Sequence, residues 1–171
     1  MRRRAVIVRR PTEYDELMDR YSTRGQVEFV LRSRGRTLED VERAHESHVS
    51  ALARVRAAIP QTWASADVER DSLSRFLFAP EDVIVVVGPD GLVANVAKYV
   101  DTQVVVGINS VPEAQAGVLV RCAPEEGICA LRRLDEGADL RVDHLTMVQA
   151  SVDDSRLLRA LNEVFIGHPS H

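Results

Sequence analysis

The feature that most constrains the fold is a strand–turn–helix–strand pattern between residues 83 and 109. Five β-branched residues, 83–87, precede the turn Gly-Pro-Asp-Gly at 88–91, an amphipathic segment at 92–100 and an apolar run at 104–109. This order is typical of a right-handed parallel crossover. Continuous Val/Ile runs without polar alternation suit a sheet that is covered on both faces. We therefore predict an α/β fold, a Rossmann-like parallel sheet with helices on both faces.

The rest of the chain extends this pattern and then departs from it. Further strands are expected at residues 5–8 and 63–68, and helices at 12–21, 26–31, 37–59, 72–78 and 124–136. Thr12 and Thr37 are the expected N-caps of two of these helices, each with Asp three residues later. From Leu140 the residues alternate, and a last strand at 158–166 after a turn at Asp153–Asp154 predicts a hairpin instead of a crossover.

Composition excludes several classes of protein. No run of 18 apolar residues is present, so we expect no transmembrane helix and no membrane partner. The Arg-rich start lacks an apolar signal region, and two cysteines cannot form a disulfide scaffold, so we expect a cytoplasmic protein. The net charge is −4 and aromatic residues make up 5%, which argues against nucleic acid as a partner although residues 1–36 are basic.

The turn at residues 88–91 is the strongest candidate site. It follows a predicted parallel strand and precedes a helix, the place where open α/β sheets bind ligands. Helix-start N–H groups favour an anion there, and Asp90 would place a carboxylate beside a bound phosphate. Such a carboxylate can accept the proton of an attacking hydroxyl. The alternative is that Pro-Asp-Gly is only a turn sequence, with Pro at its second position.

Three segments together resemble the NAD kinase family. Residues 82–98, DVIVVVGPDGLVANVAK, resemble its strand–GGDGT–helix segment, which diacylglycerol-type and phosphofructokinase-type kinases share. Residues 105–109, VVGIN, resemble the strand that follows it, and residues 161–166, LNEVFI, resemble the family's second signature. The resemblance covers residues 80–168 and keeps the family's order of segments.

The resemblance implies a function and a set of site residues. Asp90 would be the base on the adenosine ribose 2′-hydroxyl of NAD, with Gly88 and Gly91 shaping the phosphate loop. Asn162 and Glu163 would bind the adenosine moiety, for which an amide and a carboxylate suit ribose hydroxyls. ATP with Mg²⁺, or polyphosphate, would supply the phosphoryl group that converts NAD(H) to NADP(H).

The change from a crossover pattern to a hairpin pattern places a domain boundary near residue 138, and the resemblance implies what lies on each side of it. Residues 1–138 would form the α/β nucleotide-binding domain, and residues 139–171 the opening β-hairpin of a C-terminal β domain that is otherwise missing. In NAD kinases that domain supplies part of the NAD pocket and most oligomer contacts. We therefore expect small-molecule nucleotides as ligands, and either a homo-oligomer or the missing β domain as the partner that completes the protein.

Two alternatives to NAD phosphorylation stay open. Pro89 replaces the family's second loop glycine and removes a backbone N–H, and Leu92 replaces the loop threonine and removes a hydroxyl. Both changes favour a non-catalytic nucleotide-binding or interaction module. A related kinase that acts on a lipid or sugar is the other alternative, since the aspartate loop is shared.

The histidines and cysteines carry less functional signal. His45 and His48 are three residues apart on the long predicted helix, a spacing that also suits a metal, but they lack further ligands and are expected to be hydrogen-bonded interface residues. His168 and His171 repeat the spacing at the end of the chain. Cys122 and Cys129 are expected to pack as small apolar residues. No metal site is predicted.

Overall fold

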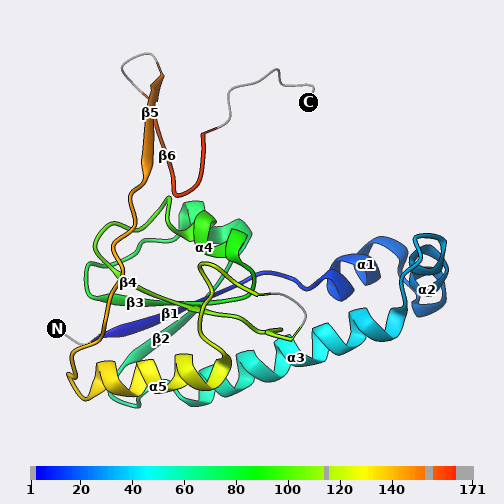
Figure 1. Cartoon of the computed structure of the whole chain (residues 1–171), viewed down its shortest axis with the longest axis horizontal. Helices are drawn as coiled ribbons and strands as arrows, with labels where there is room; N and C mark the ends of the chain where they lie inside the picture. Colours follow the sequence, from blue (N-terminus) through cyan, green and yellow to red (C-terminus); the bar gives the residue numbers. More distant parts are fainter. Residues whose placement is uncertain (1–2, 114–115, 153–155, 165–171) are drawn as a thin grey trace.

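The computed structural model describes residues 3–113, 116–152 and 156–164, and its centre is a four-stranded parallel sheet in the order β2-β1-β3-β4. The strands are β1 (Arg4–Arg9), β2 (Ala64–Glu69), β3 (Asp82–Val87) and β4 (Val104–Ile108). Every residue of β3 is buried, as its unbroken run of β-branched residues predicts. Figure 1 shows this sheet at the middle of the molecule, with helices above and below it.

The strand order creates a switch point between β1 and β3. The chain first passes from β1 to β2 on one side, and then crosses over so that β3 pairs with the other side of β1. The connections that leave β1 and β3 at their carboxyl ends therefore diverge to opposite sides of the sheet. Such a point opens a crevice at the carboxyl edge, where α/β proteins bind ligands.

Helices cover both faces of the sheet, which confirms the predicted α/β class. On one face α3 (Leu38–Ala57) and α5 (Pro124–Asp135) bury an apolar cluster that includes Val55 and Leu131. On the other face α4 (Asp90–Val96) and the 3₁₀ helix η1 (Arg70–Arg75) bury Leu92 and Leu73 against the sheet. The helix expected at 72–78 is thus a shorter 3₁₀ turn, because the chain is extended from Phe76.

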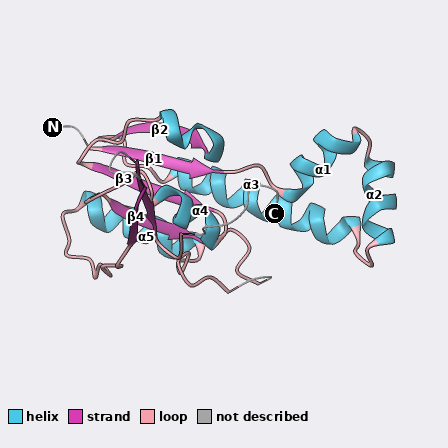
Figure 2. Ribbon diagram, turned by 90° about the horizontal axis from the view of Figure 1, so that it is seen from above, coloured by secondary structure: helices cyan, strands magenta, loops and turns pink. Residues whose placement is uncertain are grey.

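A helical arm extends from the end of the sheet (Figures 1 and 2). It consists of α1 (Glu13–Tyr21), α2 (Arg24–Ser33) and the first half of α3, which share a small core of their own. Thr12 caps α1 in a capping box with Asp15, and Thr37 caps α3, as the sequence predicts. The 20 residues of α3 join this arm to the sheet. Because α1 follows β1 in the chain, the first residues of the arm lie at the carboxyl edge of the sheet.

A separate antiparallel hairpin follows α5. It pairs β5 (Val148–Val152) with β6 (Arg156–Ala160), and an ion pair of 4.0 Å between Arg159 and Asp101 connects it to the α/β part. The sequence predicts a hairpin here, but the alternating residues 140–147 form no strand, and neither do residues 161–164 of the strand expected at 158–166. In the segment 140–147, Val142 is 50% exposed, so the alternation does not correspond to a buried face. The predicted turn at Asp153–Asp154 lies outside the described residues.

In the described residues, no helix has both the length and the apolar character needed to cross a membrane.

Candidate functional site

A crevice of about 470 Å³ lies at the switch point, and we call it the switch-point crevice. Its floor is the carboxyl edge of the sheet, with Gly88 and Pro89 after β3 and Asn109 and Ser110 after β4. The connection from β1 and the arm form the opposite wall, with polar and charged side chains from Arg10, Thr12, Glu13, Arg36, Asp40, His45 and His48. The fold therefore brings two of the three family-like segments, 82–98 and 105–109, to one hollow.

Arg10 is the cation in this crevice that is best placed to bind an anion. Its guanidinium makes no ion pair or hydrogen bond with the described residues, and it follows β1 directly. Arg36, the other arginine of the crevice, is already paired through both terminal nitrogens with Glu13. A phosphate in the crevice would therefore meet one unpaired guanidinium, which suits bidentate phosphate binding.

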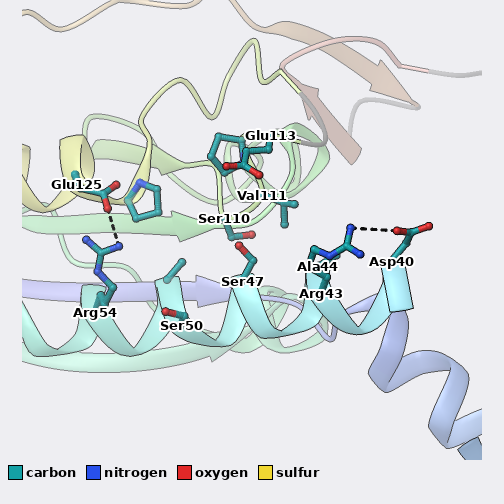
Figure 3. A pocket seen from close by; sticks show the side chains of 13 residues that line it. Asp40, Arg43, Ala44, Ser47, Ser50, Arg54, Ser110, Val111, Glu113 and Glu125 are labelled. Atoms are coloured by element: carbon teal, nitrogen blue, oxygen red, sulfur yellow. Dashed lines mark hydrogen bonds and ion pairs between the residues drawn. The ribbon is translucent and has the colours of Figure 1, made fainter. Parts of the chain in front are cut away.

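A second hollow of about 620 Å³ runs along α3 and shares Ser110 with the crevice (Figure 3). Figure 3 shows Ser47 and Ser110 on facing walls. The arginines of this groove are both engaged, Arg43 with Asp40 at 3.2 Å and Arg54 with Glu125 at 2.7 Å. It therefore offers hydroxyl groups but less uncompensated positive charge than the crevice.

Gly88 ends β3 in a conformation that favours glycine. Its φ is 151°, and a Cβ there would lie 3.2 Å from Leu92 Cδ2. Its N–H donates to the carbonyl of Ile108 at 3.0 Å, which continues the pairing of β3 with β4 into the turn. At Gly91, by contrast, a Cβ would meet no atom within 4 Å, and the φ of this residue is not positive. The fold thus requires glycine at position 88 but not at position 91.

Asp90 lies at the start of α4, but its carboxylate is not among the groups that line the crevice. It accepts three backbone hydrogen bonds of 2.8 Å each, from the N–H groups of Val118, Leu119 and Val120. Partial burial alone would raise the pKa of Asp90, but these hydrogen bonds outweigh it and hold the pKa below its usual value. In this arrangement Asp90 anchors the 118–120 segment.

The anchored segment runs beside β4 as an additional edge. Cys122 forms an isolated parallel bridge with Ile108, and its N–H donates to the carbonyl of Gly107 at 3.2 Å. Gly107 permits this close approach, because a Cβ there would lie 2.7 Å from the carbonyl oxygen of Leu119. Asp90 and Gly107 therefore act together on the same segment, one by accepting its N–H groups and one by making room for it.

Two histidines of α3 reach the crevice and are hydrogen-bonded, as expected for interface residues. His48 is 8% exposed, and its Nδ1 lies 2.9 Å from Ser110 Oγ. Burial lowers the pKa of His48 below its usual value. His45 Nδ1 lies 2.7 Å from Thr12 Oγ1 and 3.6 Å from Asp15 Oδ1. The sequence predicts neither of these pairs.

The residues expected to bind adenosine lie elsewhere. Asn162 and Glu163 follow β6, and both are exposed. Neither lines the crevice or the α3 groove. Within one chain, the described part of the structure therefore does not bring them together with Gly88 and Asp90 in either hollow.

A divalent cation has no ready-made protein site in the described part of the chain. No group of three or more His, Cys, Asp or Glu side chains there could hold a metal ion. Asp90, the carboxylate that the resemblance places near the phosphates, uses both oxygens on backbone donors. The described carboxylates that line the crevice, Glu13 and Asp40, are engaged in ion pairs with Arg36 and Arg43, so the crevice offers Mg²⁺ no carboxylate free of an ion pair.

A comparison of the chain with protein-family models and with curated protein sequences finds no match to either.

Two of the crevice residues that sequence reasoning missed share one property. Arg10 and Ser110 lie within two residues of the carboxyl ends of β1 and β4, the edge where α/β sheets bind ligands. Their short sequence separation from the predicted strand ends could have identified them as candidate site residues. The partners of Asp90 have no sequence signal, because they are backbone N–H groups, which every residue except proline carries.

Proposed function

We propose that this chain binds a nicotinamide dinucleotide in the switch-point crevice and acts as an NAD kinase-like phosphotransferase. The reaction would transfer the terminal phosphoryl group of ATP or polyphosphate to the adenosine ribose 2′-hydroxyl of NAD(H). The finer fold assignment, an NAD kinase-like nucleotide-binding domain followed by the start of a β domain, belongs to the same proposal. So do the adenosine-binding roles of Asn162 and Glu163.

The observation that carries the proposal is the convergence of family-like segments at a switch point. The Gly88–Pro89 turn and Asn109 end neighbouring parallel strands, β3 and β4, and line the same crevice. Opposite them Arg10 supplies a guanidinium that forms no ion pair or hydrogen bond with the described residues. Hydroxyl, amide, imidazole and guanidinium groups within one hollow suit the hydroxyls and phosphates of a dinucleotide.

A second candidate, nucleotide binding without turnover, is favoured by the state of Asp90. A carboxylate that accepts three N–H groups and has a lowered pKa is a poor proton acceptor. Because Asp90 does not line the crevice, its role as base would require the 118–120 segment to be released. Binding without turnover needs no such release.

The test is to measure binding and product formation separately on the same preparation. Isothermal titration calorimetry with NAD⁺ and NADH measures binding, and chromatographic detection of NADP(H) after incubation with ATP–Mg²⁺ or polyphosphate measures transfer. Binding with product supports the phosphotransferase, and binding without product supports the second candidate. Absence of binding to either dinucleotide would contradict both.

Arg10→Gln locates the site, because it removes the unpaired cation from the crevice. We expect the dissociation constant for NAD(H) to rise about tenfold or more, the usual effect of losing a charge-assisted hydrogen bond. Arg20→Gln is the matched control, since Arg20 is an exposed arginine of α1 outside the crevice lining. Equal affinities of the two variants would place the nucleotide elsewhere.

A further inference from the structure

His45 is held by a chain of hydrogen bonds that begins at a carboxylate. Its Nδ1 lies 2.7 Å from Thr12 Oγ1, and the Thr12 hydroxyl in turn donates to Asp15 Oδ2 at 2.8 Å. The ring of Tyr14 packs against the imidazole, with 5.1 Å between ring centroids. Three residues at the start of the arm therefore fix both the position and the plane of one histidine on α3.

The direction of these hydrogen bonds determines where the imidazole proton lies. Burial alone would raise the pKa of Asp15, but hydrogen bonds from Thr12 and the nearby His45 bring it below its usual value, so this carboxylate is an acceptor only. The Thr12 hydroxyl donates its single hydrogen to Asp15 in a hydrogen bond. Its oxygen must then accept the Nδ1–H of His45, which leaves the lone pair of the neutral ring on Nε2.

Nε2 is the atom that remains available to a ligand. No hydrogen bond to Nε2 exists within the described part of the chain, and the His45 side chain is 26% exposed. His45 lines the switch-point crevice together with Gly88, Pro89 and Arg10. The other imidazole there, on His48, is 8% exposed and is engaged with Ser110.

We propose that Nε2 of His45 is the proton acceptor of the switch-point crevice, with Thr12 and Asp15 as its positioning residues. This inference rests on the proposed phosphotransferase and names the base of that site. In the reaction, the ribose 2′-oxygen forms a bond to the terminal phosphorus of ATP as the bond from that phosphorus to the bridging oxygen breaks. The hydroxyl proton moves to Nε2 and later to water, and ADP leaves with the bonding electron pair.

The geometry thus assigns to two residues the roles of holding the 118–120 segment and of accepting a proton, which Asp90 would otherwise combine. Asp90 holds the 118–120 segment and does not line the crevice, whereas His45 lines it. The relation of carboxylate, hydroxyl and imidazole follows the general pattern of a base that is oriented by a further group. Imidazole is also the side chain that most often serves as a general base.

The charged and titratable groups around His45 come from several elements. Asp15 and Tyr14 lie on α1, Asp40 and His48 on α3, and Arg10 and Arg36 in the adjoining connections. The carboxylate of Asp15 lies 3.6 Å from Nδ1, where its charge can stabilise the imidazole after the ring accepts a proton on Nε2.

The experiment measures kcat and KM of NADP(H) formation by the full chain and four variants. For His45→Gln we expect kcat to fall about 100-fold or more, the usual contribution of a general base, with the dissociation constant for NAD(H) changed less than about threefold. For Asp15→Asn we expect kcat to fall about tenfold with KM little changed, because the amide lacks the charge that stabilises an imidazole carrying the transferred proton. Asp19→Asn, an exposed acid on the same helix, is the matched control and should leave kcat unchanged.

Thr12 provides the fourth variant and an independent readout. Thr12→Ala removes the hydroxyl that joins His45 to Asp15, so kcat should fall at least about tenfold while the dissociation constant for NAD(H) changes less than about threefold. In uniformly ¹⁵N-labelled wild-type protein, the imidazole spectrum should show His45 protonated on Nδ1 at pH values where the ring is neutral. This readout requires no catalysis and no mutation.

The outcomes separate the inference from the function on which it rests. Product formation by His45→Gln at a wild-type rate, or a neutral ring protonated on Nε2, overturns the inference and leaves the phosphotransferase standing. A wild-type chain that binds NAD(H) but forms no NADP(H) overturns the phosphotransferase and the proton-acceptor role together. A rate loss in His45→Gln together with a smaller rate loss in Asp15→Asn supports both.

Discussion

The carboxylate of Asp90 accepts the backbone N–H of Leu119 at 2.8 Å across a sequence separation of 29 residues. Val118 and Val120 donate to the same carboxylate, so one side chain at the start of α4 holds three consecutive residues. The segment thus held forms the outer edge beside β4. Asp90 therefore connects the turn that resembles a kinase loop to the far edge of the sheet.

Replacement of Asp90 by Asn should destabilise the fold. The amide oxygen can still accept N–H groups, but the amide nitrogen would face a donor, and the charge assistance of all three hydrogen bonds is lost. We expect a loss of about 1–3 kcal/mol in the free energy of unfolding, measured by urea denaturation at pH 7. Asp101→Asn is the control, because Asp101 is 85% exposed in its side chain and should have little effect.

The same pair of proteins gives a pH test. The folded state lowers the pKa of Asp90 from its usual value of 3.8, so the unfolded chain takes up this proton first as the pH falls. The stability that Asp90 contributes is present above about pH 4 and is lost as the pH falls through the lowered pKa. A difference between wild type and Asp90→Asn that stays constant down to about pH 2.5 would contradict this account.

Gly107→Ala should displace the 119–122 edge from β4. The new methyl group would lie 2.7 Å from the carbonyl oxygen of Leu119 and 3.1 Å from Val120 Cα, and backbone atoms cannot rotate away as a flexible side chain can. We expect a loss of about 1–3 kcal/mol, the usual cost of an overpacked site, together with faster hydrogen exchange at residues 118–120.

Gly25→Ala is the matched glycine substitution. Nothing lies within 4 Å of a Cβ at Gly25, which is in helix α2, so alanine there should stabilise the protein by about 0.5–1 kcal/mol. Thermal unfolding of both variants should therefore give midpoint changes of opposite sign. A midpoint of Gly107→Ala that is not lowered would contradict the expected clash with the 119–122 edge.

Much of the fold could be predicted from local sequence, because the signals for its elements are local. The β-branched residues 83–87 indicate a buried parallel strand, and Thr12 and Thr37 mark helix starts through cap residues with Asp three positions later. The helix after the turn begins at Asp90, two residues earlier than predicted, because Pro89 serves as its N-cap. Pro-Asp-Gly is typical of a turn, and its overlap with a helix start has no separate sequence signal.

The candidate site could be predicted less completely, because its contacts join distant segments. The position of Gly88 at the carboxyl edge follows from the strand–turn–helix order. The engagement of Asp90 by residues 118–120 does not, since its partners are backbone groups. The pairing of His45 with Thr12 depends on how the arm folds back on α3 across 33 residues, which periodicity along a single helix does not specify.

Gly91→Ala separates a requirement of the fold from a requirement of a ligand. Nothing in the structure lies within 4 Å of a Cβ at Gly91, and the residue is in helix α4, so alanine should leave stability unchanged or raise it by up to about 1 kcal/mol. If a phosphate approaches this backbone as the resemblance implies, the dissociation constant for the phosphoryl donor should rise at least about tenfold. Calorimetry with ATP checks this, and unchanged affinity would remove Gly91 from the proposed site.

His48 should make the stability of the protein depend on pH near neutrality. Burial lowers the pKa of His48 from its usual value of 6.5, so between these two pKa values the unfolded chain binds the proton and the folded chain does not. Stability should therefore decrease as the pH falls from about 7 through 6.5 toward the lowered pKa, by at most about 1.4 kcal/mol per pH unit.

In His48→Asn, whose amide can still contact Ser110 but does not titrate, this decrease should be absent. His144→Asn is the matched control, because His144 is exposed. Urea denaturation between about pH 5 and 7.5 measures all three proteins, and a wild type and His48→Asn with parallel pH dependence would show that His48 is protonated equally in the folded and unfolded states.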